Sequence, residues 1–129
     1  MLCCAIYDEL LELNLKEQRG KLIKVIEGYE LKNGVNIQLV FLELRLSAMT
    51  FPGFISAEHI RSVKGSSIAA LLYDWDRLEH WEAWESSKLK QQILQEIDTL
   101  SVSEPRITIY EVMPTSAWAY AKYQTQIIV

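Results

Sequence analysis

The pattern of hydrophobic and polar residues predicts a domain that mixes strands and helices. Alternating or β-branched apolar residues mark four predicted strands: 21–32, 54–63, 67–75 and 106–112. Apolar residues recur at helical spacing in 5–19, in 35–50 and in a stretch after Asp76 that a Ser86-Ser87 pair is expected to interrupt. From residue 21 the order is therefore strand, helix, strand, strand, helix, strand.

That order is the split β-α-β plan of ferredoxin-like α+β domains, with a four-stranded antiparallel sheet and both helices on one face. The helices cannot cover the other face, which includes Leu22, Ile26 and residues of the middle hairpin, and these are not convincingly polar. Two such sheets packed face to face would bury the exposed apolar surface. The pattern thus predicts a homodimer.

A sharp corner is predicted at Pro52-Gly53. Proline presets its backbone near φ −65°, and glycine supplies the positive φ that the next position of a type II turn needs. Phe51 and Phe54 flank the corner and can fix it to the core. Further on, Asp76 is the expected N-cap of the second helix.

Length and charge limit the partners. The chain has 129 residues, which suits one domain, and a formal net charge of −4, which disfavours nucleic acid and anionic membranes. No apolar run approaches the ~20 residues that span a bilayer. RNA-recognition domains share this strand order, but they need exposed aromatic residues and a basic surface, and the strand SSIAALLYDW lacks that pattern.

Two terminal segments lie outside this plan. We expect residues 1–20 to be an extension with a helix at 5–19, a strand through Leu11 and Leu15 being the alternative. This N-terminus lacks the features of a signal peptide, so a cytoplasmic protein is expected. Residues 21–113 form the predicted domain, and residues 114–129 form an aromatic tail that is either an added strand or an arm reaching a partner.

Glu27 is the first candidate for chemistry. Alternation places it on one face with Ile23, Val25 and Tyr29. A carboxylate on an apolar face has a raised pKa, which suits a general base. The structural alternative is an ion pair with Lys24, Lys32 or a lysine of the partner.

His59 is the second candidate, because a histidine can act as a base near neutral pH. It shares a strand face with Ile55, Ala57 and Arg61. If that face lines the dimer interface, His59 is instead an interface hydrogen-bonding residue.

Five sequence elements resemble an antibiotic biosynthesis monooxygenase (ABM) domain over about residues 21–113. They are FPGFISAE, the following RS, the strand ending in YDW, the helix phrase LEHWEAWESS and the closing PRITIYEV. The resemblance implies a ferredoxin-like protomer that pairs into a dimeric α/β barrel, with a small-molecule pocket between sheet and helices. Some members of this family oxidise polycyclic phenols to quinones with molecular oxygen and no cofactor, and others degrade haem.

The resemblance also suggests how individual residues act. The haem-degrading pattern needs a strand asparagine, a helix tryptophan and a histidine three turns later, and these positions hold Glu27, Trp84 and Leu94. Leucine cannot ligate iron, so haem degradation is disfavoured unless His59 or His80 substitutes as the ligand. No metal or other cofactor is expected. Trp84 would instead stack on a flat substrate, or else pack the helix onto the sheet.

These observations favour a cofactor-independent monooxygenase that acts on a small hydrophobic or aromatic compound. Glu27, Trp84 and His59 are the candidate catalytic residues. The candidate substrate-binding residues are Tyr29, Phe41 and Tyr73, although tyrosines in strands often serve packing. The alternative is a non-catalytic dimeric module that binds a small molecule or regulates another protein.

Overall fold

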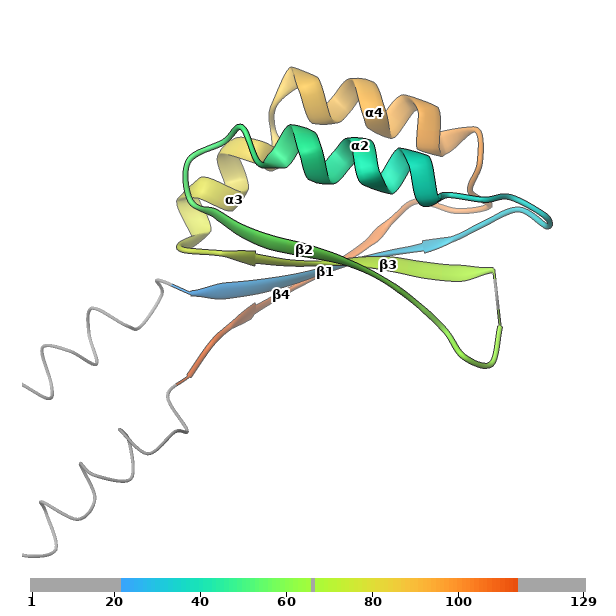
Figure 1. The fold of residues 1–129 in the computed structure, drawn as a ribbon, viewed down its shortest axis with the longest axis horizontal. Helices are drawn as coiled ribbons and strands as arrows, with labels where there is room; N and C mark the ends of the chain where they lie inside the picture. The colour runs from blue at the N-terminus through green and yellow to red at the C-terminus, as the bar shows by residue number, and fades with distance from the viewer. Residues whose placement is uncertain (1–21, 66, 114–129) are drawn as a thin grey trace, which may run out of the picture.

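The structure, a computed structural model, describes residues 22–65 and 67–113. Four strands form one antiparallel sheet in the order β2-β3-β1-β4, and all described helices lie on the same face of it (Figure 1). The elements in chain order are β1 (Ile23–Glu30), α2 (Gln38–Ala48), β2 (Phe54–Arg61), β3 (Ile68–Trp75), α3 (Leu78–Glu85), α4 (Lys88–Asp98) and β4 (Arg106–Glu111). The predicted ferredoxin-like α+β plan is confirmed, while the predictions for 1–20 and 114–129 lie outside the described residues.

The core lies between the helices and the sheet. Every second residue of β1 is buried on the helix side, as alternation predicts: Ile23, Val25, Glu27 and Tyr29. Phe41 and Leu44 of α2 close over this face, and Trp75, Trp81 and Trp84 fill the end near α3. The helix-facing side of the sheet therefore forms one wall of the core, and Glu27 is the buried carboxylate on it.

The corner at Gly53 has the predicted geometry. Gly53 has φ 86°, and its carbonyl accepts a hydrogen bond from the backbone N–H of Asp76 (2.9 Å). Phe51 packs edge-on against Trp84, and Phe54 packs edge-on against Trp75. These contacts hold the start of β2 against the end of β3.

The predicted N-cap at Asp76 is wrong. The N-cap of α3 is Arg77, whose side chain makes no capping hydrogen bond. The Asp76 carboxylate lies instead 2.6 Å from Nδ1 of His80, one helical turn further on, so it serves the corner rather than the helix end.

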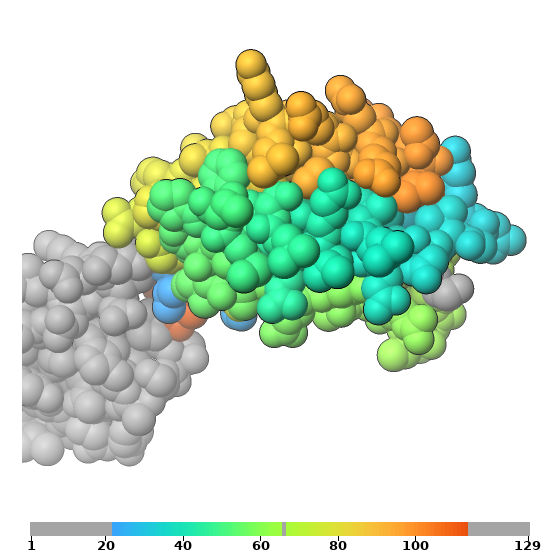
Figure 2. All heavy atoms as spheres, turned by 45° about the horizontal axis from the view of Figure 1, so that its top comes forward, coloured from blue at the N-terminus to red at the C-terminus, as the bar shows by residue number. Residues whose placement is uncertain are grey.

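The predicted break at Ser86-Ser87 is confirmed. Ser87 has an extended backbone and is the N-cap of α4, because its hydroxyl accepts a hydrogen bond from the backbone N–H of Lys90 (3.1 Å). The break lets α4 run in a new direction beside α2. Together the two helices form the layer that covers one face of the sheet (Figure 2).

Two apolar surfaces remain uncovered. On the sheet face away from the helices, the exposed or half-buried apolar residues are Leu22, Ile26, Ile60, Ile68, Ala70, Leu72 and Tyr110. On the outer side of α2 the exposed residues are Leu39, Leu42, Leu46 and Met49. Within the described part of the chain, α2 packs on the sheet and on α4, and this outer row of apolar residues has no cover.

Candidate functional site

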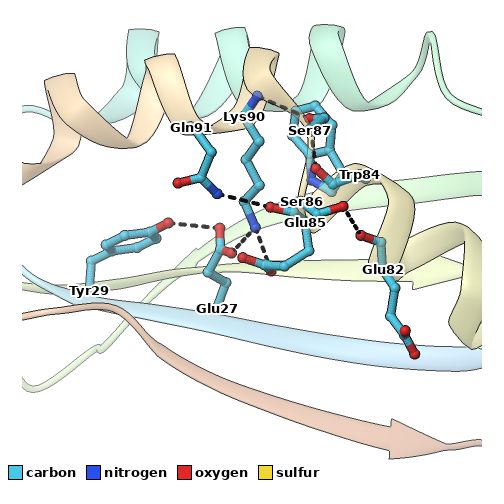
Figure 3. Close-up of polar contacts among 9 residues, drawn as sticks. All are labelled: Glu27, Tyr29, Glu82, Trp84, Glu85, Ser86, Ser87, Lys90 and Gln91. Carbon is cyan, nitrogen blue, oxygen red and sulfur yellow. Dashed lines mark hydrogen bonds and ion pairs between the residues drawn. The ribbon is translucent and has the colours of Figure 1, made fainter.

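A closed polar cluster lies beneath the helices (Figure 3). Glu27 rises from the middle of β1, and its Oε2 accepts a hydrogen bond from the hydroxyl of Tyr29 (2.7 Å). Its Oε1 accepts one from Nζ of Lys90, which descends from α4. Lys90 also donates to Oε2 of Glu85 at 2.9 Å. One ammonium therefore joins two carboxylates.

Helix α4 places Lys90 in the core. Lys90, Ile93 and Ile97 are spaced by three and four residues, so they share the inward side of the helix. The ammonium lies 4.4 Å from the ring centroid of Trp81, a distance typical of a cation–π contact. Lys90 is as fully buried as Glu27, so each charge depends on the other for stabilisation.

Burial controls the protonation of the cluster. It raises the pKa of Glu27, and the charge and hydrogen bond of Lys90 oppose this rise only in part. Burial, followed by the nearby charge of Glu27, also raises the pKa of Tyr29. The Tyr29 phenol therefore stays protonated and acts as a hydrogen-bond donor to the carboxylate.

Trp84 and Tyr73 border the same cluster. Both are fully buried, and the indole N–H of Trp84 and the hydroxyl of Tyr73 have no hydrogen-bond partner among the described residues. Burial and then the charge of Glu27 raise the pKa of Tyr73. The cluster thus contains two unused polar groups next to a buried ion pair.

Glu27 and Trp84, two of the predicted catalytic residues, lie in this closed cluster rather than in an open pocket. Neither residue lines a pocket described for this structure, because the Lys90 side chain occupies the space between β1 and α3. Of the expected alternative partners of Glu27, the two within this chain, Lys24 and Lys32, are wrong. Lys24 pairs with Asp74 on the opposite face of the sheet (2.8 Å), and Lys32 donates to the carbonyl of Thr99 (3.0 Å).

An open pocket of about 280 Å³ lies instead between α2 and the edge strand β2. His59 forms part of its wall, and its imidazole packs edge-on against Phe41 with ring centroids 4.8 Å apart. The remaining wall is mainly apolar, with Gln38 and Arg45 as its polar members. Phe41 also contacts Tyr29 (5.4 Å between centroids), so a single ring separates this pocket from the closed cluster.

His59 lies on the helix side of the sheet, so its predicted role in an interface between open sheet faces is not favoured by its position and stays a prediction. A β-bulge between Phe54 and Ser56 takes Ile55 out of the alternation, and the following register turns Ala57 and His59 toward the helices. Burial, followed by the charge of Arg61, lowers the pKa of His59 below its ordinary 6.5. The imidazole is therefore neutral at pH 7 and can accept a proton.

The structure brings the predicted residues into two groups. Glu27, Tyr29, Tyr73 and Trp84 lie in the closed cluster, while Phe41 and His59 line the open pocket. Sequence reasoning missed Lys90. Its spacing from Ile93 and Ile97 was a usable signal, since a lysine on the buried side of a helix needs a carboxylate partner.

Two further observations constrain the chemistry. Within residues 22–65 and 67–113, no cluster of three or more histidine, cysteine or acidic side chains is arranged to hold a metal ion. Among the described helices, none has the length and apolar character needed to cross a membrane.

The fold and pocket place the described residues in a known structural class. No protein-family description and no curated protein matches the sequence. Solved structures do match, and they show that the chain has the fold of the antibiotic biosynthesis monooxygenase domains.

Three of these structures illustrate the match. A putative antibiotic biosynthesis monooxygenase from Bordetella bronchiseptica is 15% identical with a TM-score of 0.65, covering 73% of this chain and 99% of its own. SnoaB, a cofactor-independent oxygenase from Streptomyces nogalater, is 11% identical with a TM-score of 0.65, covering 74% and 96%. A conserved protein from Bacteroides thetaiotaomicron, described as a possible oxidoreductase, is 16% identical with a TM-score of 0.63, covering 72% and 99%.

Proposed function

We propose that the protein is a cytoplasmic, homodimeric, cofactor-independent monooxygenase that oxidises a phenolic compound in the pocket beside His59. The single observation that carries this proposal is the position of the His59 imidazole, which packs on Phe41 in the wall of an open, mainly apolar pocket. The shared fold with a cofactor-independent oxygenase supports the reaction class.

The proposed reaction begins with proton removal. His59 accepts the phenolic proton, and the phenolate that forms can pass an electron to O₂. A carbon–oxygen bond then forms at a ring carbon to give a hydroperoxide. The protonated His59 supplies the proton of this hydroperoxide. His59 then takes the proton that the ring carbon loses as the O–O bond breaks, and passes it to the leaving hydroxide. One phenol and one O₂ yield one quinone and one water.

The pocket walls support this sequence of steps. Phe41 and Leu42 offer an apolar surface to an aromatic ring, and Arg45 on the same wall provides positive charge that would stabilise a phenolate. Glu27 and Trp84 remain predicted catalytic residues. Direct contact with a substrate would require Lys90 to leave the space that it fills. In the closed cluster Glu27 supports Phe41 through Tyr29, and Trp84 packs against Phe51.

The test is oxygen uptake with a panel of polycyclic phenols and quinols. We expect uptake by the native protein, one O₂ per quinone formed from a phenol, and a loss of about 10²-fold in kcat for His59→Gln, since a general base contributes at least that much. His80→Gln is the matched control, because His80 lies at the Gly53 corner, away from the pocket. Equal rates for native protein and His59→Gln would disprove the role of His59.

A second candidate is a ligand-binding module without catalysis. The observation that favours it is the closed cluster, since Lys90 fills the space in which the family resemblance predicts a substrate. Tight binding of a panel compound without any oxygen uptake would support this module over the oxygenase.

A further inference from the structure

A second pocket adjoins the first. Its volume is about 620 Å³, and His59 and Gln38 line both pockets. It lies at the end of the sheet where β1 leads into the loop before α2. Its wall is rich in polar side chains, which include Lys32, Asn33, Asn36, Arg61 and Ser67.

The second pocket carries positive charge in an acidic protein. Lys32 and Arg61 are cationic, and no aspartate or glutamate is among the described residues that line it. Arg61 forms no ion pair with any described residue. Lys32 is held at the rim because its ammonium donates to the carbonyl of Thr99 at the end of α4 (3.0 Å). The pocket thus presents two cations that no carboxylate neutralises.

The N-terminal end of α2 adds to the positive potential of the second pocket. Ile37 and Gln38, where α2 begins, line the pocket, and the first turn of α2 contains no acidic residue. The N-terminal end of a helix carries a partial positive charge, so it favours an anion in the same place as Lys32 and Arg61.

We propose that the two pockets together bind an amphipathic carboxylate. Its ring lies on Phe41 in the apolar pocket, and its carboxylate lies against Arg61 and Lys32 in the basic pocket. His59 stands where the pockets meet, so the ring is next to the base while the charged group is on its far side. This inference rests on the proposed function for the position of the reacting ring, and it adds the class of substrate.

The test compares two probes that differ by one group. Naphthohydroquinone and its monocarboxylate are titrated calorimetrically under nitrogen, so that no oxidation occurs. We expect the carboxylate to bind about fivefold tighter, because Lys32 and Arg61 are exposed and an ion pair at an exposed site contributes up to about 1 kcal/mol. The double variant Lys32→Gln with Arg61→Gln should abolish the difference between the probes without weakening binding of the neutral quinol.

Lys88→Gln is the matched control, since Lys88 is exposed on α4 and lines none of the described pockets. It should leave the preference for the carboxylate unchanged. Equal binding of the two probes to the native protein, or an undiminished preference in the double variant, would overturn the inference.

Assays in air with the matching pair of phenols, 1-naphthol and its monocarboxylate, separate this inference from the proposed function, because only phenols undergo the proposed oxygen insertion. Tighter binding of the carboxylate without oxygen uptake would support the carboxylate site in the basic pocket and would reject the proposed oxygenase function. Oxygen uptake with equal kcat/KM for the two phenols keeps the oxygenase and rejects the basic pocket as a substrate determinant.

Discussion

At the scale of single residues, the most constrained group is the ammonium of Lys90. It holds two carboxylates, one of them fully buried, and lies over the ring of Trp81. A buried charge that loses its partner has neither water nor a counterion to stabilise it. The cluster is therefore sensitive to any substitution that changes only one of its charges.

Replacing Lys90 by methionine should destabilise the protein by about 3–5 kcal/mol at pH 7, because the substitution keeps the apolar stem but leaves Glu27 buried without its cation. Chemical denaturation of the native and variant proteins measures the difference. Lys88→Met, two residues away and exposed, should change the free energy of unfolding by less than about 0.5 kcal/mol. Similar losses for both variants would contradict the assigned ion pair.

Glu27→Gln should change how stability depends on pH. Because burial raises the pKa of Glu27 from its ordinary 4.5, the folded state binds this proton more tightly than the unfolded state. The contribution is present below pH 4.5 and is lost as pH rises through the folded pKa. Glutamine does not titrate, so the stability of the variant relative to the native protein should rise with pH over this range. A relative stability that falls with pH would mean that Lys90 lowers the pKa instead.

At the scale of elements, the junction between α2 and β2 decides where α3 lies. A Cβ built on Gly53 would come within 2.2 Å of both Oδ1 of Asp76 and Nδ1 of His80. These two atoms are hydrogen-bonded to each other. The corner therefore packs directly on the first turn of α3, and it aligns α3 with the ends of β2 and β3.

Gly53→Ala and Gly34→Ala form a matched pair at this scale. Both glycines have positive φ, 86° and 77°, but a Cβ on Gly34 meets nothing within 4 Å. We expect Gly34→Ala to cost about 1 kcal/mol from backbone strain alone. Gly53→Ala should cost roughly 2–4 kcal/mol, because the added clash breaks the contact between Asp76 and His80. Thermal unfolding of the two variants measures the difference. Equal losses of stability would show that Asp76 and His80 can move to accommodate the added Cβ at Gly53.

At the scale of the whole molecule, the sheet has one covered face and one open face. Ile26 of β1 and Leu72 of β3 are paired at the centre of the open face, and Ile60 and Ile68 extend the apolar surface around them. The ion pair of Lys24 with Asp74 interrupts this surface without dividing it. A second copy that packs its own open face here would bury both apolar surfaces.

Leu72→Lys should therefore dissociate the proposed dimer. A lysine at the centre of an apolar interface loses most of its hydration, and Glu58, its cross-strand neighbour, compensates only in part, so we expect the dimer dissociation constant to rise by roughly 10²-fold or more. Analytical ultracentrifugation measures it. Leu39→Lys is the control, because Leu39 is 78% exposed on the outer side of α2 and its replacement should leave the mass unchanged. A native protein that sediments as a monomer would reject the dimer.

The residue pattern by itself determined the described strands and helices, their order and the inward side of β1. Alternation in β1 placed Glu27 on the buried face, and Pro52-Gly53 and Ser86-Ser87 marked the corner and the break, because backbone geometry and side-chain periodicity are local properties of the chain. Tertiary structure alone decided which groups meet. Lys90 reaches Glu27 across 63 positions of sequence, and a one-residue bulge in β2 turns His59 toward the helices. The open pocket and the closed cluster depend on that packing, which no local period of the sequence encodes.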